Sequence, residues 1–319
     1  MSTKTRMFVL VALAFLPTLG LYLYANRSIA AAHRMHQEAE LLHQADRMGL
    51  MYERILSQSE VLLGALSKMP ELRNPRQPQC NEMLSSIMGH LTYYTAIQLI
   101  EADGFVACGS LAIDESLYVG DRYYHQAALN NRQFTVGNFN VGRLTGKPIV
   151  GLAYPIERLD TPDLTGVLAV YLDLDELANS AYETGMPRAA TFTVVDREGR
   201  VMVRVPSRQS ASGADTVGAS VPASFPTPTG EFPAAYLASG VDLDGVERLF
   251  ALRPLRASSS RASGHVYFGL AEETLSEGSS AVALRYLQIL ALSGVFLLVL
   301  AWLFSRALRA GAEPRNALG

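Results

Sequence analysis

The segment from Ala96 to Ser110 reads "AIQLIEADGFVACGS", and the segment from Thr191 to Val205 reads "TFTVVDREGRVMVRV". Each consists of an apolar run, a turn with an acidic residue and a glycine, and a second apolar run. Two short apolar runs joined by such a turn predict a β-hairpin. The sequence therefore predicts two hairpins of the same design.

The similarity continues beyond the hairpins. Each is followed by an apolar strand that ends near a proline, "IVGLAYPI" and "LFALRPL", and then by a glycine and a last strand, "TGVLAVYLDLDEL" and "SGHVYFGLAEETL". Three pairs of residues recur at offsets of 95, 99 and 98 positions: Gly104 and Gly199, Pro155 and Pro254, and Gly166 and Gly264. Nearly equal offsets indicate an internal repeat. We expect an α+β fold with two tandem antiparallel-sheet modules, residues 73–180 and 181–280, each packed on helices by one face.

A long helix is predicted ahead of the two modules, over residues 27–72. Between Ile29 and Leu72, glycine occurs only at Gly49 and Gly64 and proline only at Pro70. Steps of four and three residues define a stripe of the kind found in coiled coils. The stripe consists of Leu41, Ala45, Met48, Tyr52, Ile55, Ser59, Leu62, Leu66 and Met69. It can pack along the protein's own sheet, against the same helix of a second chain, or both.

Both ends of the chain carry long apolar segments. Residues 7–26, "MFVLVALAFLPTLGLYLYAN", contain no charge, and residues 285–305 include the apolar run "YLQILALSGVFLLVLAWLFS". Each is long enough to cross a membrane as a helix. The alternative for the first segment, a cleaved signal peptide, is disfavoured by the length of its apolar core. Flanking Lys and Arg residues place residues 1–6 and 306–319 in the cytoplasm and residues 27–285 outside, in a two-pass protein of the inner (cell) membrane.

Two cysteines, Cys80 and Cys108, fall in the predicted outside region. In an oxidising compartment the simplest interpretation is a disulfide that closes a loop of about 29 residues. Two unrelated buried thiols are the alternative. The net charge of −3 excludes the basic field typical of nucleic-acid binding.

These features together resemble the double Cache sensor domain of bacterial receptors. The segments "CNEMLSSIM" to "ADGFVACGS", "VGDRYYHQAAL", "GNFNVGRLTGKPIVGLAYPI" and "GVLAVYLDLDEL" are similar to the sensor half of membrane-bound diguanylate cyclases and sensor histidine kinases. The resemblance implies PAS-like (Cache) modules and a small-molecule pocket in the module farther from the membrane. It also favours the disulfide between Cys80 and Cys108.

Candidate ligand-binding residues concentrate in the first module. Between hairpin and proline strand, the first module has the charged, aromatic segment "DRYYHQAALNNRQF", whereas the second has a Ser-, Pro-, Gly- and Ala-rich segment. Arginine and lysine donate hydrogen bonds to carboxylates or phosphates, and tyrosine adds a ring wall and a hydroxyl. Solvated basic residues and core tyrosines are the alternative interpretation. The candidates are Arg122, Tyr124, His125, Phe139, Arg143, Lys147, Tyr154 and Asp173.

The resemblance bears on the ligand residue by residue. Arg122 and Asp173 match the arginine and aspartate of amino-acid sensors in the family, but Tyr124 stands in place of a tryptophan and His125 in place of a tyrosine. An amino acid, a small carboxylate or another polar metabolite therefore all remain candidate ligands.

No catalytic motif is present in the sequence, and we expect neither enzyme activity nor a cofactor. His33, His36 and His43 lack the spacing that would aim two rings at one metal ion. We expect an extracytoplasmic small-molecule sensor that lacks its own output domain, because its predicted tail of residues 306–319 is too short for one. A homodimer and a cytoplasmic or membrane signalling partner are expected. The alternative is a membrane-anchored interaction or structural protein that acts through its long helix and transmembrane helices without a ligand.

Overall fold

The computed structural model describes residues 3–76, 78–113, 117–157, 164–183, 186–187, 189–206, 216–227, 234–257, 262–274, 287–289, 291–297, 299, 302–303 and 306. The chain divides into two compact units. The larger unit is Glu38–Glu272, and it contains both predicted modules. The other unit consists of Met1–Gln37 and Glu273–Gly319.

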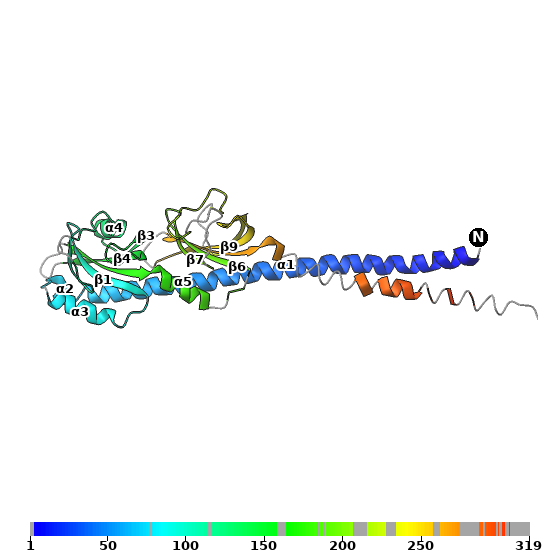
Figure 1. Cartoon of the computed structure of the whole chain (residues 1–319), viewed down its shortest axis with the longest axis horizontal. Helices are drawn as coiled ribbons and strands as arrows, with labels where there is room; N and C mark the ends of the chain where they lie inside the picture. Colours follow the sequence, from blue (N-terminus) through cyan, green and yellow to red (C-terminus); the bar gives the residue numbers. More distant parts are fainter. Residues whose placement is uncertain are drawn as a thin grey trace, which may run out of the picture. The chain divides into compact units, whose positions relative to one another are not determined.

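Helix α1 spans Thr3–Leu66, and its part within the larger unit runs along both sheets (Figure 1). Most of the predicted stripe is buried there, namely Leu41, Ala45, Met48, Tyr52, Ile55, Ser59 and Leu66. Leu62 is half-buried and Met69 is exposed. The stripe therefore packs into the protein's own core, as the first of the two interpretations expected.

The long helix ends earlier than predicted. Residues 27–72 were expected to be one helix, but α1 ends at Leu66 and a short helix α2, Pro70–Arg73, follows. Pro70 has no backbone N–H, so it cannot continue the hydrogen-bonding pattern of α1 but can begin a new helix. The prediction of a continuous helix to residue 72 is therefore wrong by one turn.

The first module is a five-stranded antiparallel sheet with the order β2-β1-β5-β4-β3. Its strands are β1 (Tyr94–Glu101), β2 (Val106–Gly109), β3 (Thr135–Val141), β4 (Pro148–Glu157) and β5 (Leu164–Asp173). Its further helices are α3 (Gln79–Met88), α4 (Tyr123–Asn131) and α5 (Leu174–Glu183). α1 packs on one face of the sheet and α4 on the other (Figure 1). The predicted disulfide is confirmed: Cys80 of α3 is bonded to Cys108 of β2, with 6.0 Å between their Cα atoms.

The second module repeats this topology, with the order β7-β6-β10-β9-β8. Its strands are β6 (Ala190–Asp196), β7 (Val201–Val205), β8 (Tyr236–Val241), β9 (Glu247–Leu255) and β10 (Gly264–Ala271). Arg253 of β9 joins this sheet to α1, with 2.8 Å between its Nη2 and Oε2 of Glu53. The described residues between β7 and β8, 216–227, form no helix corresponding to α4.

The repeated glycines have the same function in both modules. A Cβ atom at Gly166 would lie 2.0 Å from the carbonyl oxygen of Ile100, and one at Gly264 would lie 2.3 Å from that of Val195. Neither position has room for a side chain, because the neighbouring strand approaches too closely. The internal repeat predicted from the sequence is thus confirmed by strand order and by matched close approaches.

None of the helices formed by the described residues combines the length and the apolar character needed to cross a membrane. The first predicted span, residues 7–26, lies within α1, although the side chains of residues 7–18 are outside the description. The second predicted span, residues 285–305, lies partly outside the described residues.

Candidate functional site

A pocket lies in the first module between the sheet, helix α4 and the hairpin that joins β3 to β4. Its open space amounts to about 420 Å³, including its solvent-facing mouth. The wall is partly apolar, with Ala96, Leu117, Val119, Leu144 and Ile149. The polar side chains that line it are Thr95, Gln98, Arg122, Tyr124, Asn140, Arg143, Thr145 and Tyr171. Apolar surface combined with convergent polar groups is typical of small-molecule sites.

A hydrogen-bonded chain of buried side chains forms one side of the pocket. The hydroxyl of Tyr171 donates to Oε1 of Gln98 at 2.6 Å, so the hydroxyl of Tyr124, 3.2 Å away, donates to Tyr171. The two tyrosine rings meet edge to face, with 5.7 Å between their centroids. Burial raises the pKa of Tyr124 and of Tyr171, which keeps both hydroxyls neutral at physiological pH.

Glycine in β4 allows Tyr124 to lie against the sheet. A Cβ atom at Gly151 would come within 2.4 Å of Cδ1 of Tyr124, so any larger residue there would displace the ring. Gly151 pairs with Tyr171 on β5, and the tyrosine ring of α4 covers the space that the glycine leaves open. The ring wall of the pocket thus depends on this strand position.

Two arginines stand at the rim. Arg122, just before α4, donates through Nη1 to Oδ1 of Asn140 and through Nη2 to the carbonyl oxygen of Val141 at 3.3 Å. Arg143, from the β3–β4 hairpin, donates to both carboxylate oxygens of Asp121, at 3.0 and 2.7 Å. The hydrogen bonds from Arg143 hold the pKa of Asp121 below its usual range. Both partners of this ion pair are partly exposed, so the pair is weak and can open to a competing anion.

Three of the eight predicted ligand residues line this pocket: Arg122, Tyr124 and Arg143. Lys147 and Asp173 are not among the lining residues, and they pair with each other at 2.6 Å. Asp173 also accepts a hydrogen bond from the N–H of Asp175, 3.1 Å away, at the start of α5. The hydrogen bond from Lys147 to Asp173 raises the pKa of the lysine.

The remaining three predicted residues lie elsewhere in the larger unit. Tyr154 faces α1, where its ring packs 3.6 Å from the Cβ position of Gly64. Side chains alternate between the faces of a strand, so Tyr154 is on the opposite face from Gly151. His125 is buried, with its Nε2 2.9 Å from the carbonyl oxygen of Glu101. Phe139 is half-buried, and its ring lies beside Gly218 of the second module, where a Cβ atom would come within 2.7 Å of it.

Sequence reasoning missed five polar residues of the pocket: Thr95, Gln98, Asn140, Thr145 and Tyr171. Gln98 and Tyr171 lie in apolar runs of predicted strands. A usable signal was present for Gln98, which is the one polar residue in the run "AIQLI" and is buried. A buried polar residue needs a partner, and a polar position inside an apolar strand therefore indicates a hydrogen-bonding site.

The pocket borders on direct contacts between the two modules. Arg197, in the turn between β6 and β7, lies over the ring of Tyr123 of α4, with Cζ 4.5 Å from the ring centroid. Its Nη2 donates to the carbonyl oxygen of Val136 at 2.6 Å. The N–H of Phe139 in β3 donates to Oδ2 of Asp196 at 3.0 Å. Helix α4 and strand β3, which both contribute to the pocket, therefore touch the second module directly.

No protein-family model matches this chain, and no curated protein matches it in sequence. Solved structures match its fold. One is the extracellular domain of rpHK1S-Z16, a protein classed as a histidine kinase. It matches with a TM-score of 0.62 and 17% identity, over 76% of this chain and 98% of that domain. The ligand-binding domain of the Pseudomonas fluorescens chemoreceptor CtaA, in complex with L-serine, has a TM-score of 0.59 and 15% identity over 75% and 99%. The ligand-binding domain of the Pseudomonas aeruginosa PAO1 amino-acid chemoreceptor PctB, in complex with L-Gln, has a TM-score of 0.60 and 16% identity over 78% and 98%.

The protein therefore has the fold of double Cache sensor domains, with a long N-terminal helix followed by two antiparallel sheets. The resemblance expected from the sequence is confirmed at the level of the fold. At these sequence identities the fold alone is shared.

Proposed function

We propose that this chain is the extracytoplasmic input domain of a signal-transduction receptor and that its first module binds a small organic anion. One observation carries the proposal: the pocket is lined by two arginines and by no acidic residue among the described residues. Guanidinium groups match carboxylates in two-point geometry. The buried tyrosine and glutamine chain beside them is neutral and supplies hydrogen bonds without opposing the charge.

The ligand class follows from the state of the nearest carboxylates. CtaA and PctB were solved with amino acids, whose ammonium group needs an acceptor. Here neither Asp121 nor Asp173 lines the pocket, and each is paired with a basic side chain. We therefore favour a small carboxylate without an ammonium group over an amino acid.

The proposed location rests on the disulfide, the fold and the two apolar segments. The disulfide between Cys80 and Cys108 is typical of an oxidising compartment. The matching domain of rpHK1S-Z16 is extracellular. We propose that residues 7–26 and 285–305 anchor the chain in the cell membrane with residues 27–285 outside, as a homodimer that acts on a signalling partner.

The proposed mechanism uses the contacts between the modules. A ligand that binds Arg122 and Arg143 draws α4 and the β3–β4 hairpin together and so favours one arrangement of the first module. It can shift an equilibrium only by its difference in affinity for the two arrangements. Because Arg197 contacts Tyr123 and Val136, this shift reaches the β6–β7 turn of the second module directly.

The alternative, an interaction protein that acts through its long helix without a ligand, relied on the stripe from Leu41 to Met69. Most of that stripe is buried against the protein's own sheets. This burial supports the sensor proposal over an alternative in which the stripe recruits a second chain.

The test is a calorimetric and thermal-shift screen of the full chain, purified in mild detergent, against acetate, malonate, succinate and the amino acids of equal size. We expect a carboxylate to bind and Arg122→Ala to weaken binding by about 10- to 100-fold, because a charge-assisted hydrogen bond is lost. Lys147→Ala is the matched control, since it removes one positive charge from the same region outside the pocket, and it should bind normally. Binding that survives Arg122→Ala, or no binding by a folded chain, would contradict the proposal.

A further inference from the structure

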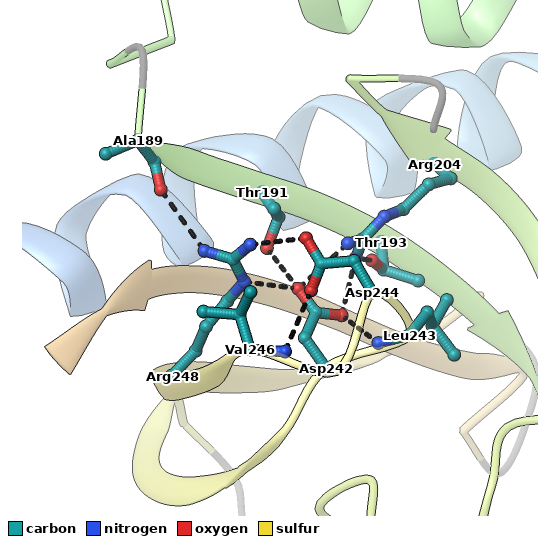
Figure 2. A network of polar contacts seen from close by, with 9 residues as sticks. All are labelled: Ala189, Thr191, Thr193, Arg204, Asp242, Leu243, Asp244, Val246 and Arg248. Carbon is teal, nitrogen blue, oxygen red and sulfur yellow. Dashed lines mark hydrogen bonds and ion pairs between the residues drawn. The ribbon is translucent and has the colours of Figure 1, made fainter. Parts of the chain in front are cut away.

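A buried carboxylate in the second module is surrounded like a bound ligand. Asp242, directly after β8, accepts hydrogen bonds from both terminal nitrogens of Arg204, each at 2.8 Å. Nε of Arg248 donates to Oδ2 of Asp242 at 2.6 Å, and the hydroxyl of Thr191 donates to the same oxygen at 2.9 Å. The N–H of Leu243 donates to Oδ1 at 2.7 Å. Figure 2 shows the Asp242 carboxylate between the guanidinium groups of Arg204 and Arg248.

This cluster is closed to solvent, and both oxygens of the Asp242 carboxylate accept hydrogen bonds. The side chains of Asp242, Arg204 and Arg248 are exposed by 0%, 1% and 6%. Nη2 of Arg248 also binds Oδ2 of Asp244 at 2.6 Å, and Nη1 of Arg204 donates to the hydroxyl of Thr193 at 2.6 Å. A buried carboxylate needs partners for both oxygens. Here Oδ1 accepts hydrogen bonds from Arg204 and Leu243, and Oδ2 accepts them from Arg204, Arg248 and Thr191.

The cluster occupies the place that the pocket occupies in the first module. Four residues that line the pocket correspond, through the repeat, to four residues of the cluster. The pairs are Ala96 and Thr191, Gln98 and Thr193, Ile149 and Arg248, and Gly142 and Asp242.

The register of the strands supports this correspondence. Gln98 is paired with Gly109 of β2, as Thr193 is paired with Arg204 of β7. Gly142 donates its N–H to the carbonyl oxygen of Lys147 at 2.9 Å, and Asp242 donates its N–H to that of Val246 at the same distance. Gly142 has no side chain to offer, whereas Asp242 at the same point of its hairpin extends a carboxylate into the sheet.

We propose that the second module is a carboxylate-binding site that carries its own ligand, the side chain of Asp242. The two arginines and Thr191 provide the groups that would recognise a free monocarboxylate of one or two carbons. The tethered carboxylate excludes such a ligand, so the second module stays in its occupied form and does not respond to dissolved anions. This inference does not depend on what the first module binds.

The test is chemical rescue by an anion of matched size. Asp242→Ala removes the volume of formate, and Asp242→Gly removes the volume of acetate. Both variants are made in the full chain with Arg122→Ala, so that an anion in the first module does not contribute. We expect Asp242→Ala to lower Tm on the order of 10 °C, because Arg204 and Arg248 lose their buried partner. Formate should restore much of this loss in a saturable manner, whereas sodium chloride at equal ionic strength should not.

The size of the anion and the shape of the site provide the controls. Acetate should rescue Asp242→Gly better than Asp242→Ala. Asp242→Asn keeps the space filled and should respond to neither anion. If Asp242→Ala fails to fold, its refolding yield from denaturant in formate is compared with that in chloride. Equal yields, or equal responses of the alanine and asparagine variants, would overturn the proposal.

Discussion

At one pair of facing strand positions, the two modules place glycine on opposite strands. In the first module Gly151 of β4 faces Tyr171 of β5, whereas in the second Phe250 of β9 faces Gly269 of β10. In the second module the Phe250 ring packs against Phe225, with 5.3 Å between centroids. In the first, the large residue is a tyrosine whose hydroxyl joins Tyr124 to Gln98 in a hydrogen-bonded chain. Each glycine leaves room for an aromatic ring, Tyr124 at Gly151 and Phe250 at Gly269, and the polarity of the rings decides whether the space becomes packed core or polar wall.

The ion pairs of the two modules also differ, in their exposure to solvent. Arg143 and Asp121 of the first module are partly exposed, whereas Arg204 and Asp242 of the second are buried and paired with each other. A binding site must keep donors that a ligand can recruit. This difference agrees with the two proposals, ligand exchange in the first module and a permanently occupied arrangement in the second.

The largest expected effect is the loss of stability when an arginine is removed from the second module, compared with the same change in the first. Arg204→Met should lower the free energy of unfolding by about 3–5 kcal/mol, because Asp242 loses a buried partner. Arg122→Met should lower it by less than about 1 kcal/mol, since Arg122 is only half-buried. Urea unfolding of the full chain measures both. Equal losses in the two variants would contradict the difference in burial that we assign to the two arginines.

The decrease of the free energy of unfolding at acid pH gives a second test of the Arg204–Asp242 pair. Burial alone would raise the pKa of Asp242, but the hydrogen bonds and charge of Arg204 outweigh it and hold that pKa below its usual range. The stabilisation is therefore present above the ordinary carboxylate pKa of about 4 and is lost as the pH falls through the lowered value. Arg204→Met should flatten this acid-dependent loss.

A second difference is the disulfide, which only the first module has among the described residues. Replacing both Cys80 and Cys108 by serine should lower the free energy of unfolding by about 3 kcal/mol, because the 28-position separation closes a loop of intermediate length. Hydrogen exchange should show reduced protection in α3 and β2 and unchanged protection in β6 and β7. An equal loss of protection in both sheets would show that the modules unfold as one unit.

The smallest expected effect on stability comes from the rim of the pocket. Asp121→Asn should change the free energy of unfolding by less than about 1 kcal/mol, because the ion pair with Arg143 is partly exposed. Arg143 would then be free to bind an anion, so carboxylate affinity should increase by a few-fold. Titration calorimetry measures the affinity, and a weaker binding constant would indicate that Asp121 assists the ligand instead of competing with it.

The fold was largely predictable because its signals are local and repeated. The two hairpins, the matched prolines and the matched glycines placed both sheets, and the cysteine pair placed the disulfide. The site was predictable only in part. Arg122, just before α4, and Tyr124, within it, belong to a charged, aromatic segment that has no helical counterpart among the described residues of the second module, so composition alone marked them. Gln98 and Tyr171 lie in apolar strands, and only the register shows that they meet.

The sequence by itself determined the two-module plan, because periodicity and turn residues act over a few positions. Only the tertiary structure decided which charges are available. Lys147 and Asp173 pair across 26 positions, and Arg204 and Asp242 pair across 38. Such partners are chosen by strand register, which depends on the packing of whole sheets rather than on neighbouring residues. For this reason the same repeat contains an open pocket in one module and a tethered carboxylate in the other.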